Sequence, residues 1–263
     1  MNQKLTTVIK ILLFLVHSIM HTGLVASPKI WINPMDGMRF VWVEPGSVWV
    51  QSEPSKDFIE GANLRVLEMK YGFWMAETEV TIGQYRKFVQ ATSYITDAEV
   101  NDSEYNWKNP GFDQSENHPA VYLSFRDAQS YAKWARVNLP TESEWVFALR
   151  AGTNSLYPWE DEPILNNAWL RENSPYGTHE VALKPPNFSG VFDLVGNAYE
   201  YCIFEPKDSS NCNVQSVPRG GSWTRCSESV WFDLPSPPTD CFPWNYALPY
   251  DDDRGFRCVK RLN

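Results

Sequence analysis

A pair of short helices joined by an elbow is the feature that most constrains how this chain can fold. Ser124 and Thr141 each stand three residues ahead of a carboxylate residue, which is the capping-box pattern of a helix start. Apolar residues at helical spacing follow each box, so we expect helices from Ser124 to about residue 136 and from Thr141 to about residue 152. Pro140 stands between them and ends the first helix. The pattern therefore predicts two separate helices in this part of the chain.

Short strands are expected before these helices. Apolar and aromatic residues over 38–50 surround a Pro45-Gly46 turn, which predicts an opening hairpin. A second strand is expected over 71–76. A further capping box at Thr81 predicts a helix over 82–91.

Irregular backbone is expected to fill much of the rest. Residues 93–117 are polar and turn-rich, so we expect a long surface loop. From residue 151 onward, short apolar segments alternate with Pro, Gly, Asn and Asp. Aromatic residues make up 14% of the chain, beside 19 Pro and 14 Gly, which favours a loop-rich fold held together by aromatic packing. No linker divides the sequence, so we expect one α+β domain over residues 30–263.

Residues 1–27 have the layout of a secretory signal peptide. Lys4 and Lys10 accompany an apolar run over 8–16, and small residues follow up to Ser27. The run is short for a transmembrane helix, so an uncleaved anchor is the minority hypothesis. We therefore expect an exported protein, periplasmic or secreted, with no stable membrane span after cleavage.

Charge and histidine content exclude some functions. Without residues 1–27 the chain keeps 21 basic and 32 acidic residues, a net charge of −11. This argues against binding to nucleic acid or to anionic membranes. The run over 251–253, three Asp residues, is most simply a solvated loop. Only His118 and His179 remain in that mature chain, so it cannot build a three-histidine metal site.

The stretch over 191–202 has two interpretations. Gly196-Asn197 is a turn signal, which predicts a hairpin. Asp193 and Glu200 also place two carboxylates on either side of that turn, and loop carbonyls between them could face inward. Oxygen donors of this kind suit Ca²⁺. The stretch alone does not decide between the hairpin and the ion site.

Four motifs in a fixed order carry a resemblance to a known family. They are Glu77–Tyr85, Leu139–Trp145, Val191–Cys202, and Arg219–Trp223 with Gly255–Arg257. Together they resemble the formylglycine-generating enzyme, or sulfatase-modifying factor, domain family over about residues 35–260. The resemblance implies a C-type-lectin-like fold with short strands and two or three helices.

Members of that family bind structural calcium, and the resemblance implies two sites here. The first would use Asp193, Gly196, Ala198 and Glu200. The second would use Asn167, Ala168 and Asn173. The Asn173 position usually holds a carboxylate in the family, and a neutral ligand should weaken the second site.

The cysteines depart from the family pattern. Its oxidases bind Cu(I) through two closely spaced cysteines beyond the Gly-Gly-Ser segment, because soft thiolates suit Cu(I). Here Ser222 matches a serine near their active centre, and Cys226 follows it, but the next cysteine is Cys241. Copper is therefore doubtful, and the candidate catalytic residues are Cys226 and Ser222. Proximity in sequence favours the disulfides Cys202–Cys212 and Cys226–Cys241, and a copper pair of Cys226 with Cys241 is the minority alternative.

Three functions remain open. The first is a copper-dependent formylglycine-generating oxidase. The second is a non-standard oxidoreductase, as in exported relatives that mature pyoverdine-type siderophores, or an inactive relative. The third is a non-catalytic display protein whose binding surface lies within 224–254. That segment holds several aromatics among small polar residues: Trp231, Phe232, Phe242, Trp244, Tyr246 and Tyr250. We expect an exported, calcium-stabilised protein of the second kind, with a peptide, siderophore-like or protein ligand.

Overall fold

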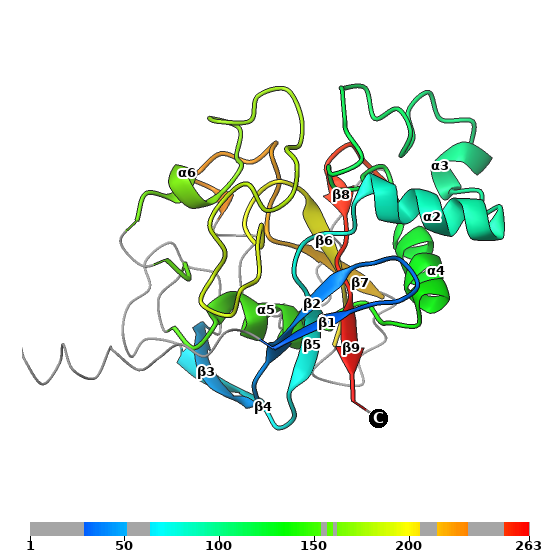
Figure 1. The fold of residues 1–263 in the computed structure, drawn as a ribbon. Coiled ribbons are helices and arrows are strands. Elements are labelled where there is room, and N and C mark those ends of the chain that lie inside the picture. The colour runs from blue at the N-terminus through cyan, green and yellow to red at the C-terminus, as the bar shows by residue number, and fades with distance from the viewer. Residues whose placement is uncertain are drawn as a thin grey trace, which may run out of the picture.

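A four-stranded antiparallel sheet, in the order β1-β2-β5-β9, lies at one end of the molecule (Figure 1). Its strands are β1 (Ile30–Ile32), β2 (Arg39–Val43), β5 (Phe73–Ala76) and β9 (Val259–Arg261). The computed structural model describes residues 29–51, 64–153, 157–159, 162–205, 215–230 and 250–262. The register joins Met75 of β5 to Val259 of β9, so segments from opposite ends of the described chain complete one sheet.

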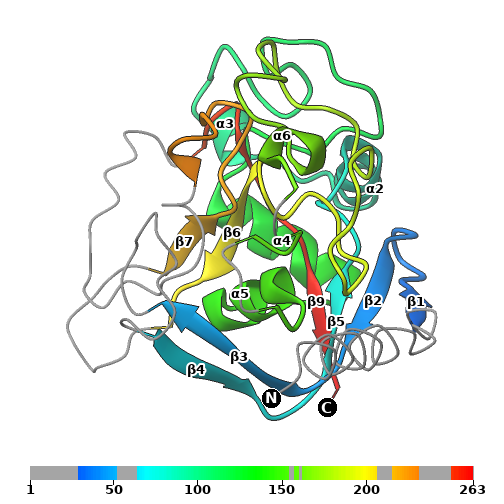
Figure 2. The same ribbon diagram turned by 90° about the vertical axis from the view of Figure 1, so that its left-hand side faces the viewer.

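Two smaller sheets accompany it. One pairs β3 (Gly46–Gln51) with β4 (Leu64–Met69) in antiparallel fashion. In the other, β6 (Tyr199–Ile203) lies between β7 (Ser216–Arg219) and the short parallel strand β8 (Arg254–Gly255). The helix α5 packs against the strands β3, β4, β6 and β7, as Figure 2 shows.

The predicted opening hairpin over 38–50 is wrong, although both of its strands exist. β1 and β5 occupy the two edges of β2, so β3 has no edge of β2 to pair with. The chain instead turns after Val43 and continues as β3 in a different sheet. Val43 and Val48 nevertheless bury their side chains in the same core cluster, which explains why both segments have strand-like apolar patterns.

The predicted helices are confirmed by their capping boxes. They are α2 (Ile82–Thr92), α4 (Phe125–Ala135) and α5 (Glu142–Arg150), which begin after Thr81, Ser124 and Thr141. The elbow between α4 and α5 lies against the C-terminal strand, because Asn138 and Val259 exchange two backbone hydrogen bonds of 2.8 Å. The sequence interpretation missed two four-residue helices, α3 (Asp97–Val100) within the expected loop and α6 (Ile164–Asn167).

Aromatic packing fills the core, as the composition indicates. Tyr85 contacts the rings of Trp107, Tyr131 and Phe256, with centroids 5.2, 5.8 and 6.4 Å away. The fold is thus a mixed α and β arrangement of short strands and irregular backbone. Among the described residues, no helix is long and apolar enough to span a membrane. The signal-peptide prediction, Cys212, Cys241 and most of the segment 224–254 lie outside the described residues.

Candidate functional site

The motif over 191–202 is a tight loop leading into β6, so the hairpin interpretation is wrong. β6 pairs with the later strands β7 and β8, and residues 191–198 contain no strand. Asp193, Gly196 and Asn197 all adopt positive φ, at 54°, 80° and 56°. Gly196 is required for a second reason, because a Cβ there would lie 2.3 Å from the carbonyl oxygen of Trp169.

A fully buried ion pair anchors this loop. The guanidinium of Arg257 donates from Nη2 to Glu200 Oε1 and from Nε to Glu200 Oε2, each at 2.6 Å. Trp145 Nε1 donates to the same Oε2 at 2.7 Å. Arg257 also donates to the carbonyls of Ala76 and Phe192, and thereby ties β5 to the loop.

Glu79 adds a third buried carboxylate to this cluster. Asn197 Nδ2 donates to Glu79 Oε1 at 3.0 Å, whereas Glu79 Oε2 has no hydrogen-bond partner among the described residues. Burial, followed by repulsion from Asp193, raises the pKa of Glu79 well above its usual value. Glu79, Asn197 and Arg257 lie within the sequence motifs, but sequence alone did not reveal that they meet in one cluster.

Asp193 is the carboxylate of the first predicted calcium site that Arg257 does not bind directly. Its Oδ2 accepts a hydrogen bond from the backbone N–H of Ala182 at 2.7 Å, and burial raises its pKa to about 6. Three carboxylates therefore share one guanidinium, with an unpartnered oxygen on Glu79. Glu200 is already bound by Arg257, and the raised pKa values of Glu79 and Asp193 show that their charges are not fully balanced there. A proton or a cation could supply the missing balance.

The donor set at that position is limited. In the part of the chain that the structure describes, no three Asp, Glu, His or Cys side chains lie close enough together to hold a metal ion. A calcium ion at the first site would thus depend on Asp193 and on the backbone carbonyls of Gly196 and Ala198. Glu200 would share its carboxylate with Arg257.

The residues of the second predicted calcium site do come together. Asn173 Nδ2 donates to the carbonyl oxygen of Ala168 at 2.9 Å, and the buried Asn167 ends α6 beside it. The direction of this hydrogen bond matters for metal binding. The Asn173 amide turns its nitrogen, and not its oxygen, toward the carbonyl that would bind the ion.

Ser222 lies in a buried hydroxyl–carboxylate cluster. Its Oγ donates to Asp253 Oδ2 at 2.8 Å, and Thr224 Oγ1 donates to the same oxygen at 2.8 Å. Burial raises the pKa of Asp253, while the two hydroxyl hydrogen bonds oppose that rise. Ser222 is 0% exposed. Its hydrogen bond to Asp253 joins the segment after β7 to the segment before β8.

Cys226 carries a free thiol near this cluster. Its Sγ lies 3.0 Å from Ser229 Oγ, and this hydrogen bond lowers the pKa of the thiol. Cys202 and Cys258 are also free thiols, but both are fully buried, in two different core clusters. The expected partners in the predicted disulfides Cys202–Cys212 and Cys226–Cys241 lie outside the described residues, so these two pairings remain predictions. Cys202 lies on β6, and its side chain is buried in the core.

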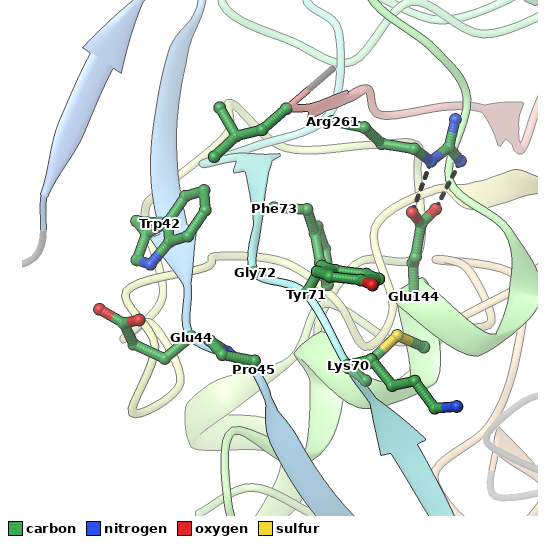
Figure 3. Close-up of a pocket in the computed structure, with 11 residues that line it drawn as sticks. Trp42, Glu44, Pro45, Lys70, Tyr71, Gly72, Phe73, Glu144 and Arg261 are labelled. Atoms are coloured by element: carbon green, nitrogen blue, oxygen red, sulfur yellow. Dashed lines mark hydrogen bonds and ion pairs between the residues drawn. The ribbon is translucent and has the colours of Figure 1, made fainter.

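A surface groove of about 790 Å³ forms a separate feature (Figure 3). Glu144 and Arg261 face each other at one end, joined at 2.7 Å, and Trp42 lies toward the other end. Gly72 allows this arrangement, because a Cβ there would meet the Trp42 ring at 2.2 Å. Sequence analysis did not identify the groove, since its walls come from β2, β5, β9 and α5.

Comparison with known proteins places this geometry in a family. The family described as sulfatase-modifying factor enzyme 1-like domain matches residues 32–262. The chain belongs to this family. It is 28% identical to the mouse formylglycine-generating enzyme over 225 aligned residues, which cover 61% of this chain and 59% of the mouse protein. The chain thus spans less than two thirds of that relative's length.

A further relative and a solved structure extend the comparison. The bovine protein named inactive C-alpha-formylglycine-generating enzyme 2 is 29% identical over 242 residues, covering 73% of this chain and 79% of that protein. The structure of PvdO from Pseudomonas aeruginosa superposes with a TM-score of 0.67 at 19% identity, covering 90% of this chain and 99% of PvdO. The C-type-lectin-like fold expected from the motifs is confirmed.

Proposed function

We propose that this protein is an exported family member that acts without a copper cysteine pair, as a non-standard oxidoreductase of the pyoverdine-maturation type. The environment of Cys226 carries this proposal. Among the described residues, its partner at 3.0 Å is the hydroxyl of Ser229. A two-cysteine copper site needs a second thiolate instead. The Ser222 hydroxyl, in turn, is already engaged by Asp253.

The relatives support the same conclusion. The bovine relative that is named inactive aligns with 73% of this chain. The scaffold is therefore kept in a protein whose name says that it does not form formylglycine. The likeness to PvdO extends over 99% of that protein and supports the shared fold. The substrate class that we propose, a pyoverdine-type siderophore precursor, follows from the family resemblance of the motifs. The leader-like residues 1–27 support export.

One experiment separates the oxidase from the non-standard enzyme. The full chain is incubated with Cu(I), oxygen and a sulfatase-type cysteine peptide, and mass spectrometry measures formylglycine. We expect none. Formylglycine made by the wild type and lost in Cys226→Ser would overturn the proposal. In parallel, a pyoverdine-type precursor should show a change in its chromophore spectrum with consumption of oxygen.

The second candidate is a non-catalytic protein that binds a ligand through the segment 224–254. Aromatic residues near the two described parts of this segment, 224–230 and 250–254, favour it. Tyr122 contacts the rings of Tyr105 and Tyr250, and Phe112 contacts Trp223 at 5.6 Å. Such rings suit ligand recognition. The same precursor distinguishes the two functions: quenching of tryptophan fluorescence without any spectral change of the precursor would favour binding alone.

A further inference from the structure

The second position predicted to bind calcium is already filled by donors of this chain. The carbonyl oxygens of Leu165 and Ala168 converge on Asn173 Nδ2, at 3.0 and 2.9 Å. The ammonium of Lys184 reaches the same Leu165 oxygen at 2.6 Å. Converging carbonyls of this kind need a cation or N–H donors, and here the chain supplies both.

The orientation of the Asn173 amide is fixed by its other end. Leu170 donates its backbone N–H to Asn173 Oδ1 at 2.8 Å. A flipped amide would set its NH₂ group against that N–H and its oxygen against two carbonyl oxygens. Asn173 therefore cannot present an oxygen to an ion that is also bound by Ala168, and both of its N–H donors are already used.

The position of Lys184 is equally well defined. Its Nζ lies 4.1 Å from the centre of the Trp169 ring, which is a cation–π contact. Burial lowers the pKa of Lys184, and the charge of Asp193 partly offsets this fall. The ammonium thus lies between the Leu165 carbonyl, an aromatic face and the nearby carboxylate, and it would repel a second cation placed there.

We propose that Lys184 and Asn173 replace the divalent cation at this position, so that the loop between α6 and Lys184 folds without metal. Ca²⁺ normally takes six to eight oxygen ligands that include carboxylates. This position offers an amide nitrogen and an ammonium instead. The proposal is independent of the enzymatic function and of any ion bound near Asp193.

The first test counts the calcium ions bound by the full chain. Isothermal titration calorimetry with CaCl₂ compares the wild type with Asn173→Ala. We expect the same number of bound ions in both, whatever that number is. One ion fewer in Asn173→Ala would overturn the proposal, because Asn173 would then be a calcium ligand.

The second test converts the position into a metal site. Asn173→Asp combined with Lys184→Met supplies a carboxylate and removes the ammonium. We expect one more bound Ca²⁺ than in the wild type, and a rise in Tm of about 3 °C or more on adding CaCl₂. The matched control combines Asn173→Asp with Lys260→Met, since Lys260 is a half-buried lysine that reaches a backbone carbonyl at 3.4 Å. The control should gain no ion.

The outcomes are separable. A folded double variant that gains no calcium, or a control that gains as much, would overturn the role of Lys184. Circular dichroism establishes whether each variant is folded. Lys184→Met alone should lower Tm, and calcium should not restore it. If the double variant does not fold, the comparison of the wild type with Asn173→Ala still decides the question.

Discussion

Arg257 binds both carboxylate oxygens of Glu200 at 2.6 Å, and neither side chain is exposed to solvent. This pair joins the Gly-Phe-Arg motif to β6, and through the carbonyl of Ala76 it also reaches β5. Removing one partner would leave the other charge buried and uncompensated, which is far more costly than losing an exposed pair.

Glu200→Gln should therefore lower the free energy of unfolding by about 3–5 kcal/mol. The matched control is Glu44→Gln, because Glu44 pairs with Lys29 at 2.9 Å on the surface. The control should cost far less, because an exposed ion pair is screened by solvent and contributes little. Urea denaturation of both variants measures the difference. Equal costs would show that the buried pair contributes no more than a surface contact.

Gly196→Ala should destabilise the protein by more than about 3 kcal/mol, because the new Cβ would lie 2.3 Å from the Trp169 carbonyl. Gly152→Ala is the control for backbone conformation. Gly152 has a nearly identical φ of 82°, but a Cβ there meets nothing within 4 Å. We expect the control to cost only about 1 kcal/mol. Thermal melts measure both variants. A similar loss of Tm in the two would mean that the positive φ, and not the contact with Trp169, accounts for the whole effect.

The buried carboxylates should make stability depend on pH. Burial raises the pKa of Asp193 to about 6, above its value in the unfolded chain. The folded state therefore holds a proton that the unfolded state has lost, and stability falls as pH rises from about 4 to about 6. The size of this fall is about 3 kcal/mol. Urea melts in EDTA at pH 4.5 and pH 7 should show about 2 kcal/mol of this fall, because Asp193 is already partly ionised in the unfolded chain at pH 4.5.

Asp193→Asn is the variant that tests this origin. The amide cannot titrate, and its oxygen can still accept the N–H of Ala182. In EDTA the variant should lose most of the fall in stability and become more stable than the wild type at pH 7. An unchanged pH profile would assign the dependence to other groups, with Glu79 first among them because its pKa is also raised.

Calcium should stabilise the protein through the first predicted site, beside Asp193, and not through the second, beside Asn173. If an ion binds beside Asp193, adding calcium at about 100 times Kd stabilises the fold by about 2.7 kcal/mol. EDTA should then lower Tm in the wild type and in Asn173→Ala alike, but not in Asp193→Asn. Differential scanning fluorimetry gives the three comparisons. A wild type insensitive to EDTA would mean that Arg257 alone balances the carboxylates.

Local signals made part of this fold predictable. The capping boxes at Thr81, Ser124 and Thr141 gave three helix starts correctly, because a cap is decided within four residues. The box at Thr96 was overlooked, since α3 is only four residues long and has no apolar period. The opening hairpin failed because strand pairing depends on which edges remain unoccupied, and β1 and β5 already occupy those of β2.

The candidate sites show the same limit. Asp193 and Glu200 were found as carboxylates around a turn, but the sequence did not show that Arg257, 57 positions later, binds Glu200. Nor could it show that Asn173 presents nitrogen to Ala168, because an amide has both a donor and an acceptor end. The choice is made by the N–H of Leu170, which only the folded loop positions.

The pairing of β5 with β9 has a consequence for how the protein is made. Met75 of β5 pairs with Val259 of β9, which lies near the end of the domain. The edge of β5 therefore stays uncovered until β9 has been made. Distant pairings of this kind form slowly, and open strand edges attract other chains while they wait. The β5 edge is therefore the place where an incompletely folded chain can pair with other chains until β9 covers it.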